Sequence, residues 1–200
     1  MKYEDEGIIR LRKEQRKEEY HDIRGEGVYI GDRFVRFSPR QIGSMATLFI
    51  PEDFIDMPQE VRLIKYPSQA RPEEILTSLD GRVSFAFQML EEIPKGQITV
   101  LALQMKELLH KANPSIVFNS EEMGTLSDGC TICMFDFENS GVDGRIYHMM
   151  CFAAWEGGVL HGTFNCPQED EEEWRDAVWQ AFLTIQDQES EEQGEQNGTD

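Results

Sequence analysis

Residues 145–166, RIYHMMCFAAWEGGVLHGTFNC, decide the fold because two strand-like runs flank a glycine pair. Gly157-Gly158 is typical of a tight hairpin turn, and the flanking residues are mostly apolar or aromatic, as in strands. If Glu156 lies opposite Val159, one face of the hairpin carries only apolar residues and one glycine. Its members are Tyr147, Met149, Cys151, Ala153, Trp155, Leu160, Gly162, Phe164 and Cys166. This face predicts a strand pair packed on a hydrophobic core.

The opposite face of the same hairpin is also too apolar to lie in water. It combines Ile146, Met150 and Phe152 with His148 and His161. Because a contiguous apolar patch marks a contact, the sequence predicts a sheet that is covered on both faces. Two alternatives stay open for this second face. Either the two clearest helices lie on opposite sides of the sheet, or one helix covers part of a face and a partner protein covers the rest.

Further strands and two helices are expected on either side of the hairpin. Strand-like runs cover 28–30, 33–37, 47–50, 61–66, 76–79, 82–90, 115–119 and 131–137, and proline follows two of them, at Pro51 and Pro67. Apolar residues recur at helical spacing over 101–109 and 174–185. The order predicts an α/β protein of the α+β type, a three-layer sandwich in which a twisted, mostly antiparallel sheet carries helices packed on its faces.

Composition divides the 200 residues into three parts. Residues 1–26 are densely and alternately charged, which predicts a charged helical extension. Residues 27–186 hold the strand and helix patterns and predict a single α/β sandwich domain. Residues 187–200 contain no apolar residue, so we expect a disordered acidic tail.

The net charge of −19 limits the classes of partner. Nucleic acids and anionic lipids bind through lysine and arginine, so neither is expected as a partner. The chain has no run of eighteen apolar residues, and its first twenty lack the apolar centre of a secretory signal. We therefore expect no membrane insertion and a cytoplasmic location.

The cysteines and acidic residues predict neither a metal site nor a cofactor site. Cys130 and Cys133 form a CxxC, but the run that follows is strand-like, so their sulfurs should point to opposite faces. Cys151 and Cys166 are expected as small buried hydrophobes. The segment 136–141 superficially resembles a calcium loop, yet it lacks the alternating oxygen ligands and the closing glutamate, so a hairpin loop is expected there.

The chain carries no sequence motif of a nucleotide-binding loop or a hydrolase, and we expect no catalytic residue. His148 and His161 share one face of the hairpin, but a shared metal would need further ligands from elsewhere. A partly buried, hydrogen-bonded histidine is the expected state of both.

Several short motifs resemble the PsbP-like superfamily, in its bacterial DcrB-like branch. They are Phe49-Ile50-Pro51, Ile64-Lys65-Tyr66-Pro67, the segment 162–167 and a closing helix with Trp174 and Phe182-Leu183-Thr184-Ile185. The resemblance implies a twisted antiparallel sheet between helices. It also implies a non-catalytic binder, since that fold includes photosystem assembly factors, a Ran-binding import factor and chaperones that shield apolar effector segments. It transfers no site residue, because the matching motifs are structural.

Together these features predict a non-catalytic protein-binding module, an adaptor or chaperone-like protein whose partner is another protein. The expected contact residues are Ile146, His148, Met150, Phe152 and His161. One alternative is a small-molecule-binding protein or enzyme that uses a pocket of the two histidines and nearby carboxylates. Another is a structural subunit of a larger assembly. The sequence does not predict the oligomeric state.

Overall fold

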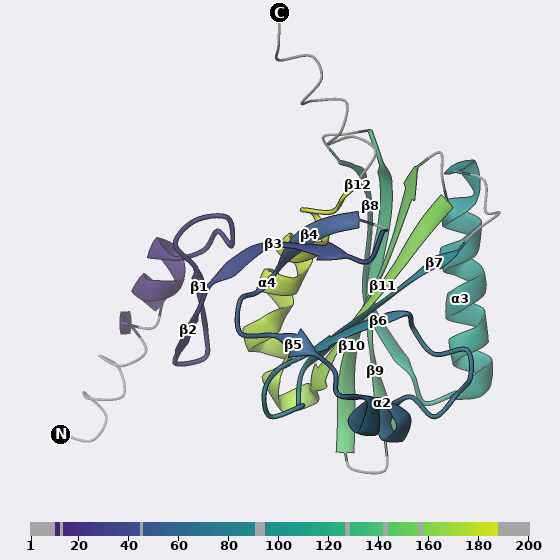
Figure 1. Ribbon diagram of the computed structural model, residues 1–200, viewed down its shortest axis with the longest axis horizontal. Helices are drawn as coiled ribbons and strands as arrows, with labels where there is room; N and C mark the ends of the chain where they lie inside the picture. The colour runs from purple at the N-terminus through teal and green to yellow at the C-terminus, as the bar shows by residue number, and fades with distance from the viewer. Residues whose placement is uncertain are drawn as a thin grey trace, which may run out of the picture.

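A seven-stranded antiparallel sheet forms the centre of the molecule (Figure 1). The computed structural model describes residues 11–187, apart from residues 13, 45, 91–94, 127–128, 142–143 and 156–157. The strand order is β5-β6-β7-β11-β10-β9-β8, and each pairing is antiparallel. The strands are β5 (Ile55–Asp56), β6 (Glu74–Thr77), β7 (Ser84–Leu90), β8 (Val117–Thr125), β9 (Thr131–Gly141), β10 (Gly144–Trp155) and β11 (Gly158–Pro167).

The first face of this sheet carries the larger core. It is covered by α4 (Glu171–Phe182) and by a three-stranded sheet of β12 (Gln186–Asp187), β4 (Ala46–Pro51) and β3 (Phe37–Ile42). A short hairpin of β1 (Val28–Ile30) and β2 (Arg33–Val35) joins the same core. Helix α4 follows the predicted apolar stripe, since Trp174, Val178 and Phe182 are buried in this core.

The second face is covered by two separate helices. Helix α3 (Ile98–Ala112), which a single 3-10 turn (Lys95–Gln97) precedes, packs on β9 and β10. Helix α2 (Gln59–Lys65) lies near β6 and β7, where Val61 and Tyr66 pack against Ile75 and Ala86. The predicted α/β sandwich with helices on both faces of an antiparallel sheet is therefore confirmed.

The late hairpin keeps the predicted faces in a shifted register. Trp155 pairs with Gly158 and Tyr147 with Cys166, whereas the sequence-based pairing placed Glu156 opposite Val159. The difference is two residues along one strand. Because side chains alternate with a period of two, an even shift exchanges partners but leaves every side chain on its predicted face.

Two strand predictions are wrong. Residues 61–65 lie in α2 rather than in a strand, and Tyr66 caps the helix. Pro58 precedes the helical turn, with Glu60 near its N-terminus and basic residues near its end. The predicted strand 33–37 is divided between β2 and β3, with Arg36 between them.

Both ends of the described chain are attached to the domain. Residues 11–12 and 14–19 are helical, and Ile23, within the predicted extension, is 1% exposed in the first-face core. Asp187, the first residue of the predicted tail, pairs with Ala46 in β12. Residues 1–10 and 188–200 lie outside the described residues. Among the described residues, no helix has the length and hydropathy to cross a membrane.

Candidate partner-binding surface

A polar strip crosses the second face between the clusters under α2 and α3. Adjacent strands contribute its members: Gln88 pairs with His161, and Asn165 pairs with His148, with Thr163 between them. All five side chains are half-buried, whereas most of their apolar neighbours on the same face are buried. Polar residues on a covered face are costly unless they are hydrogen-bonded, and Asn165 accepts a hydrogen bond from Ser84 at 3.0 Å. We name this group, Gln88, His148, His161, Thr163 and Asn165, the histidine strip.

Each histidine of the strip stacks on a phenylalanine of the α3 cluster. The ring of His148 lies 4.8 Å from that of Phe137 at an interplanar angle of 12°, and the ring of His161 lies 4.7 Å from that of Phe152 at 7°. Burial lowers the pKa of both histidines to about 4. Both imidazoles are therefore neutral near pH 7, and each offers one donor and one acceptor.

The two imidazoles differ in their hydrogen bonds. Nε2 of His161 lies 3.3 Å from Oγ1 of Thr163. Nε2 of His148 is buried and has no hydrogen-bond partner among the described residues. A buried nitrogen without a partner costs about 1–3 kcal/mol, which a bound group could recover.

The sheet positions around the strip carry no carboxylate among the described residues. Among the described residues, the second-face positions that adjoin the two histidines along and across the strands are apolar or uncharged. They are Ser84, Ala86, Gln88, Leu90, Cys133, Phe135, Phe137, Asn139, Ile146, Met150, Phe152, Ala154, Val159, Thr163, Asn165 and Pro167. The strip therefore suits hydrogen bonds to a neutral polar group, such as a peptide amide, better than proton transfer through a histidine–carboxylate pair.

The structure separates the five predicted contact residues into two groups. His148, His161 and Ile146 are half-buried in or beside the strip. Met150 and Phe152 are 9% and 0% exposed and pack in the α3 cluster with Ile98 and Ala102. As folded, these two side chains therefore belong to the core, and α3 supplies the cover that the sequence left open.

Sequence reasoning missed a buried polar cluster on the first face, around Asp136. This residue was expected to start a loop, but it lies inside β9 and is 0% exposed. Its carboxylate accepts hydrogen bonds from the Tyr147 hydroxyl at 2.9 Å and the Ser120 amide at 2.6 Å, and pairs with Arg175 at 2.8 Å. The available signal was a lone aspartate in an apolar strand run, which requires partners when buried.

The cysteines lie as the sequence predicts. Cys130 packs in the first-face core and Cys133 in the α3 cluster, so the two sulfurs of the CxxC lie on opposite sides of the sheet. Burial raises the pKa of Cys133 to about 11. All four cysteines are buried.

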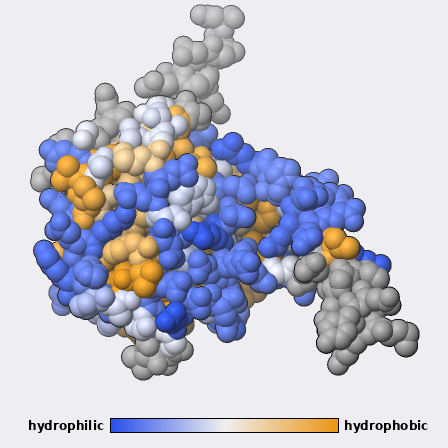
Figure 2. Space-filling model, turned by 180° about the vertical axis from the view of Figure 1, so that it is seen from behind, coloured by the Kyte–Doolittle hydropathy of each residue, from blue (hydrophilic) through white to orange (hydrophobic). Residues whose placement is uncertain are grey.

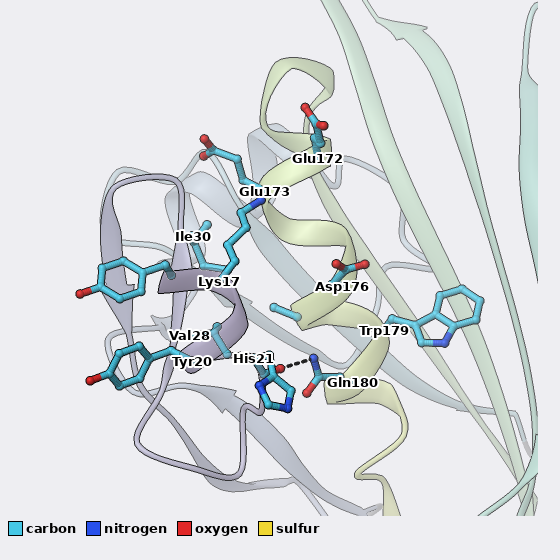
Figure 3. A pocket seen from close by; sticks show the side chains of 12 residues that line it. Lys17, Tyr20, His21, Val28, Ile30, Glu172, Glu173, Asp176, Trp179 and Gln180 are labelled. Atoms are coloured by element: carbon cyan, nitrogen blue, oxygen red, sulfur yellow. Dashed lines mark hydrogen bonds between the residues drawn. The ribbon is translucent and has the colours of Figure 1, made fainter. Parts of the chain in front are cut away.

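A cavity of about 330 Å³ lies where the N-terminal segment meets α4 (Figure 3). Tyr20 and His21 line one side of it and Glu173 and Asp176 the other. The side-chain amide of Gln180 donates to the carbonyl of His21 at 2.8 Å. These contacts attach the N-terminal segment to α4.

Comparison with solved structures identifies the fold. The solution structure of cyanobacterial PsbP (CyanoP) from Synechocystis sp. PCC 6803 aligns with a TM-score of 0.57 at 10% identity, covering 80% of this chain and 97% of that one. LpqN, involved in cell envelope biogenesis of Mycobacterium tuberculosis, aligns with a TM-score of 0.48 at 15% identity, covering 78% of this chain and 93% of that one.

A protein of unknown function from Pseudomonas aeruginosa, PA94, aligns at 13% identity over 74% of this chain and 94% of that one, with a TM-score of 0.38. No family model and no curated protein matches the sequence. At such identities the likeness concerns the fold alone, which is the fold that the sequence motifs implied. The chain therefore shares its fold with cyanobacterial PsbP.

Proposed function

We propose that this protein is a non-catalytic protein-binding module whose histidine strip receives an uncharged, largely apolar segment of another protein. The observation that carries the proposal is the buried Nε2 of His148, which has no hydrogen-bond partner among the described residues. A peptide or amide group of the partner that bonded to this nitrogen would satisfy it. The neutral state of both histidines favours an uncharged occupant.

Apolar side chains on the two covering helices support this choice of occupant. Helix α2 exposes Leu63 and Ile64, at 49% and 80%, and α3 exposes Val100, Leu103 and Leu108 at 51%, 52% and 60%. Figure 2 shows hydrophobic residues gathered in patches on the half of the molecule opposite the N-terminal segment, where the seven-stranded sheet and α3 lie. Exposed apolar patches bordered by polar residues are typical of protein-binding surfaces.

The alternative of an enzyme with a histidine–carboxylate pocket has less support. The second-face positions that adjoin the histidines carry no carboxylate among the described residues. General acid–base catalysis also needs a pKa near the working pH, and the pKa of each histidine is about 4. A cytoplasmic location and an adaptor or chaperone-like role remain parts of the proposal.

A site-specific photo-crosslinker tests the surface directly. We would place benzoylphenylalanine at Thr163, inside the strip, and at Arg36, an exposed residue outside the sheet, and crosslink each protein in its host cells. We expect a defined protein adduct from position 163 and none of the same mass from position 36. The same adduct from both positions, or none from position 163, would contradict the proposal.

The crosslinked partner, once purified, gives the quantitative test. Replacing His148 by Ala should weaken binding by about tenfold, because the bond to the buried nitrogen is lost. Replacing His110, an exposed histidine near the end of α3, by Ala is the matched control and should leave the dissociation constant unchanged. Equal effects of the two substitutions would show that the strip is not part of the interface.

A further inference from the structure

Strand β8 lies at one end of the seven-stranded sheet, and the second half of it is exposed. It is the last strand in the sheet order, so among the described residues its outer edge has no neighbouring strand. Residues 121–125 pair one to one with residues 131–135 of β9, and all five are exposed. A regular edge of this kind presents free N–H and C=O groups in the spacing that another strand requires.

The edge begins at a bulge that the buried cluster holds in place. The register shifts between Phe118 and Glu121. Within that shift, the Ser120 amide donates to Asp136, and its hydroxyl accepts from Arg175 at 2.6 Å. Because these bonds fix the bulge, the backbone beyond it is held in a defined position rather than left to fray.

A cavity of about 270 Å³ flanks the edge on the first-face side. Glu122 of β8 lines it together with Arg175, Asp176 and Trp179 of α4. Figure 3 shows Trp179 projecting from α4 toward the long strands, away from Tyr20 and His21. The cavity therefore combines an aromatic ring with carboxylates from two elements.

The charge of this cavity is negative despite the arginine. Arg175 is paired with Asp136 at 2.8 Å and lies 3.9 Å from Glu171. Glu122 and Asp176 make no ion pair among the described residues, whereas Glu121, on the other side of the strand, is paired with Lys106 at 2.6 Å. Two unpaired carboxylates beside an indole ring form an environment that favours a cation.

We propose that β8 is a second interaction surface, at which a basic, extended segment of another protein adds to the sheet as an eighth strand. The strand edge supplies the backbone hydrogen bonds. Glu122, Asp176 and Trp179 receive a lysine or arginine of the segment. Alternate side chains of an added strand point to the same face. A segment with a basic residue at every second position would therefore place these basic side chains on the side of the cavity.

Charge selects this occupant over a second copy of the chain. Two β8 edges paired with each other would bring together two sets of acidic side chains, in a protein whose net charge is −19. Like charges opposite each other destabilise a strand pair. The edge is thus protected against self-association and open to a basic strand. This proposal is independent of the histidine strip, which lies on strands β7, β10 and β11.

The test uses the full-length protein and a short peptide of alternating Lys and Val with blocked ends. Binding of the peptide is measured by fluorescence anisotropy. We expect saturable binding that weakens as salt increases, accompanied by slower hydrogen exchange in residues 121–125. A matched peptide with alternate backbone nitrogens methylated keeps the charge but loses edge hydrogen bonds, and should bind at least about tenfold more weakly.

A charge-reversed pair of variants locates the site. Glu122→Lys with Asp176→Lys should weaken the peptide at least about tenfold, whereas Glu26→Lys with Glu52→Lys makes the same change of net charge at exposed positions elsewhere and should weaken it little. Equal loss in both double variants, or equal binding of the methylated peptide, would show general charge attraction and overturn the proposal. Binding that survives the His148→Ala substitution would show that this surface stands apart from the histidine strip.

Discussion

The two faces of the seven-stranded sheet are covered in different ways. On the first face, α4 and the three-stranded sheet close over one continuous core, and the polar cluster buried there is fully paired, with Asp136 bonded to Arg175, Tyr147 and Ser120. On the second face, α2 and α3 cover separate clusters, and the polar residues between them include His148, whose Nε2 has no partner among the described residues. The first-face cluster thus satisfies the buried carboxylate within the fold, whereas the second face leaves the buried nitrogen of His148 available to a binding partner.

The largest effect on stability is expected at Asp136, the buried carboxylate of the first face. Replacing Asp136 by Ala leaves Arg175, the Tyr147 hydroxyl and the Ser120 amide without their shared acceptor. We expect the free energy of unfolding to fall by about 3–5 kcal/mol, measured by urea denaturation. The control is Asp53→Ala, which breaks an exposed pair with Arg33 at 3.3 Å and should cost less than about 1 kcal/mol. A loss of that small size in the Asp136 variant would mean that the first face is no better paired than the surface.

Two adjacent methionines, one on each face of the sheet, allow the two faces to be compared. Met149 is 0% exposed in the first-face core, and Met150 is 9% exposed at the margin of the α3 cluster. Replacing either by Ala should destabilise the fold within a range of about 2–5 kcal/mol, with Met149 near the top and Met150 near the bottom, because Met150 lies beside the open strip. The reverse order in urea denaturation would contradict the contrast between a closed face and a partly open one.

The pH dependence of the free energy of unfolding should show the contribution of the two histidines of the strip. Because burial lowers the pKa of His148 and His161 to about 4, from an ordinary value of 6.5, the unfolded chain binds protons that the folded chain does not between these values. Stability therefore falls as the pH falls from 6.5 toward 4. Between pH 6.5 and 5 we expect a loss of roughly 1–2 kcal/mol for each histidine.

The double variant His148→Gln with His161→Gln cannot take up these protons. Its denaturation midpoint should be nearly flat between pH 6.5 and 5, where few carboxylates titrate. If wild type and variant have the same pH profile, the imidazoles are more solvated than the strip geometry implies, and the case for a desolvated binding surface weakens.

The smallest effect is expected at the cysteines, which lie on both faces. Each thiol is buried, and burial raises the pKa of Cys133 to about 11, so the reactive thiolate is scarce at neutral pH. Labelling of the native protein with a thiol-specific chromophore should be slow, whereas urea should expose four reactive groups. Rapid labelling of a thiol in the native state would show that one face opens.

Much of the fold could be predicted from local patterns. Period-two alternation assigned Tyr147 and Met149 to one face and His148 and Met150 to the other, and an error of two residues in register did no harm because the period is two. The apolar stripes of α3 and α4 were equally readable. The run 61–66 misled because a short apolar segment has no clear period, so the helical start at Pro58 decided its structure.

The candidate site depended on information that no local pattern holds. The sequence alone determined that the sheet has two apolar faces, that the two cysteines of CxxC lie on opposite faces, and that both histidines share a face, since each follows from the period-two alternation of strands and of a hairpin. Only the tertiary structure decided that α3 covers Met150 and Phe152 while the neighbouring histidines stay half-buried. It also decided that Asp136 meets Arg175 across 39 residues of sequence (175 − 136). The physical reason is that the covering of a sheet face and the pairing of a buried charge depend on where helices distant in sequence pack. The residues next to a side chain in the sequence do not determine where those helices pack.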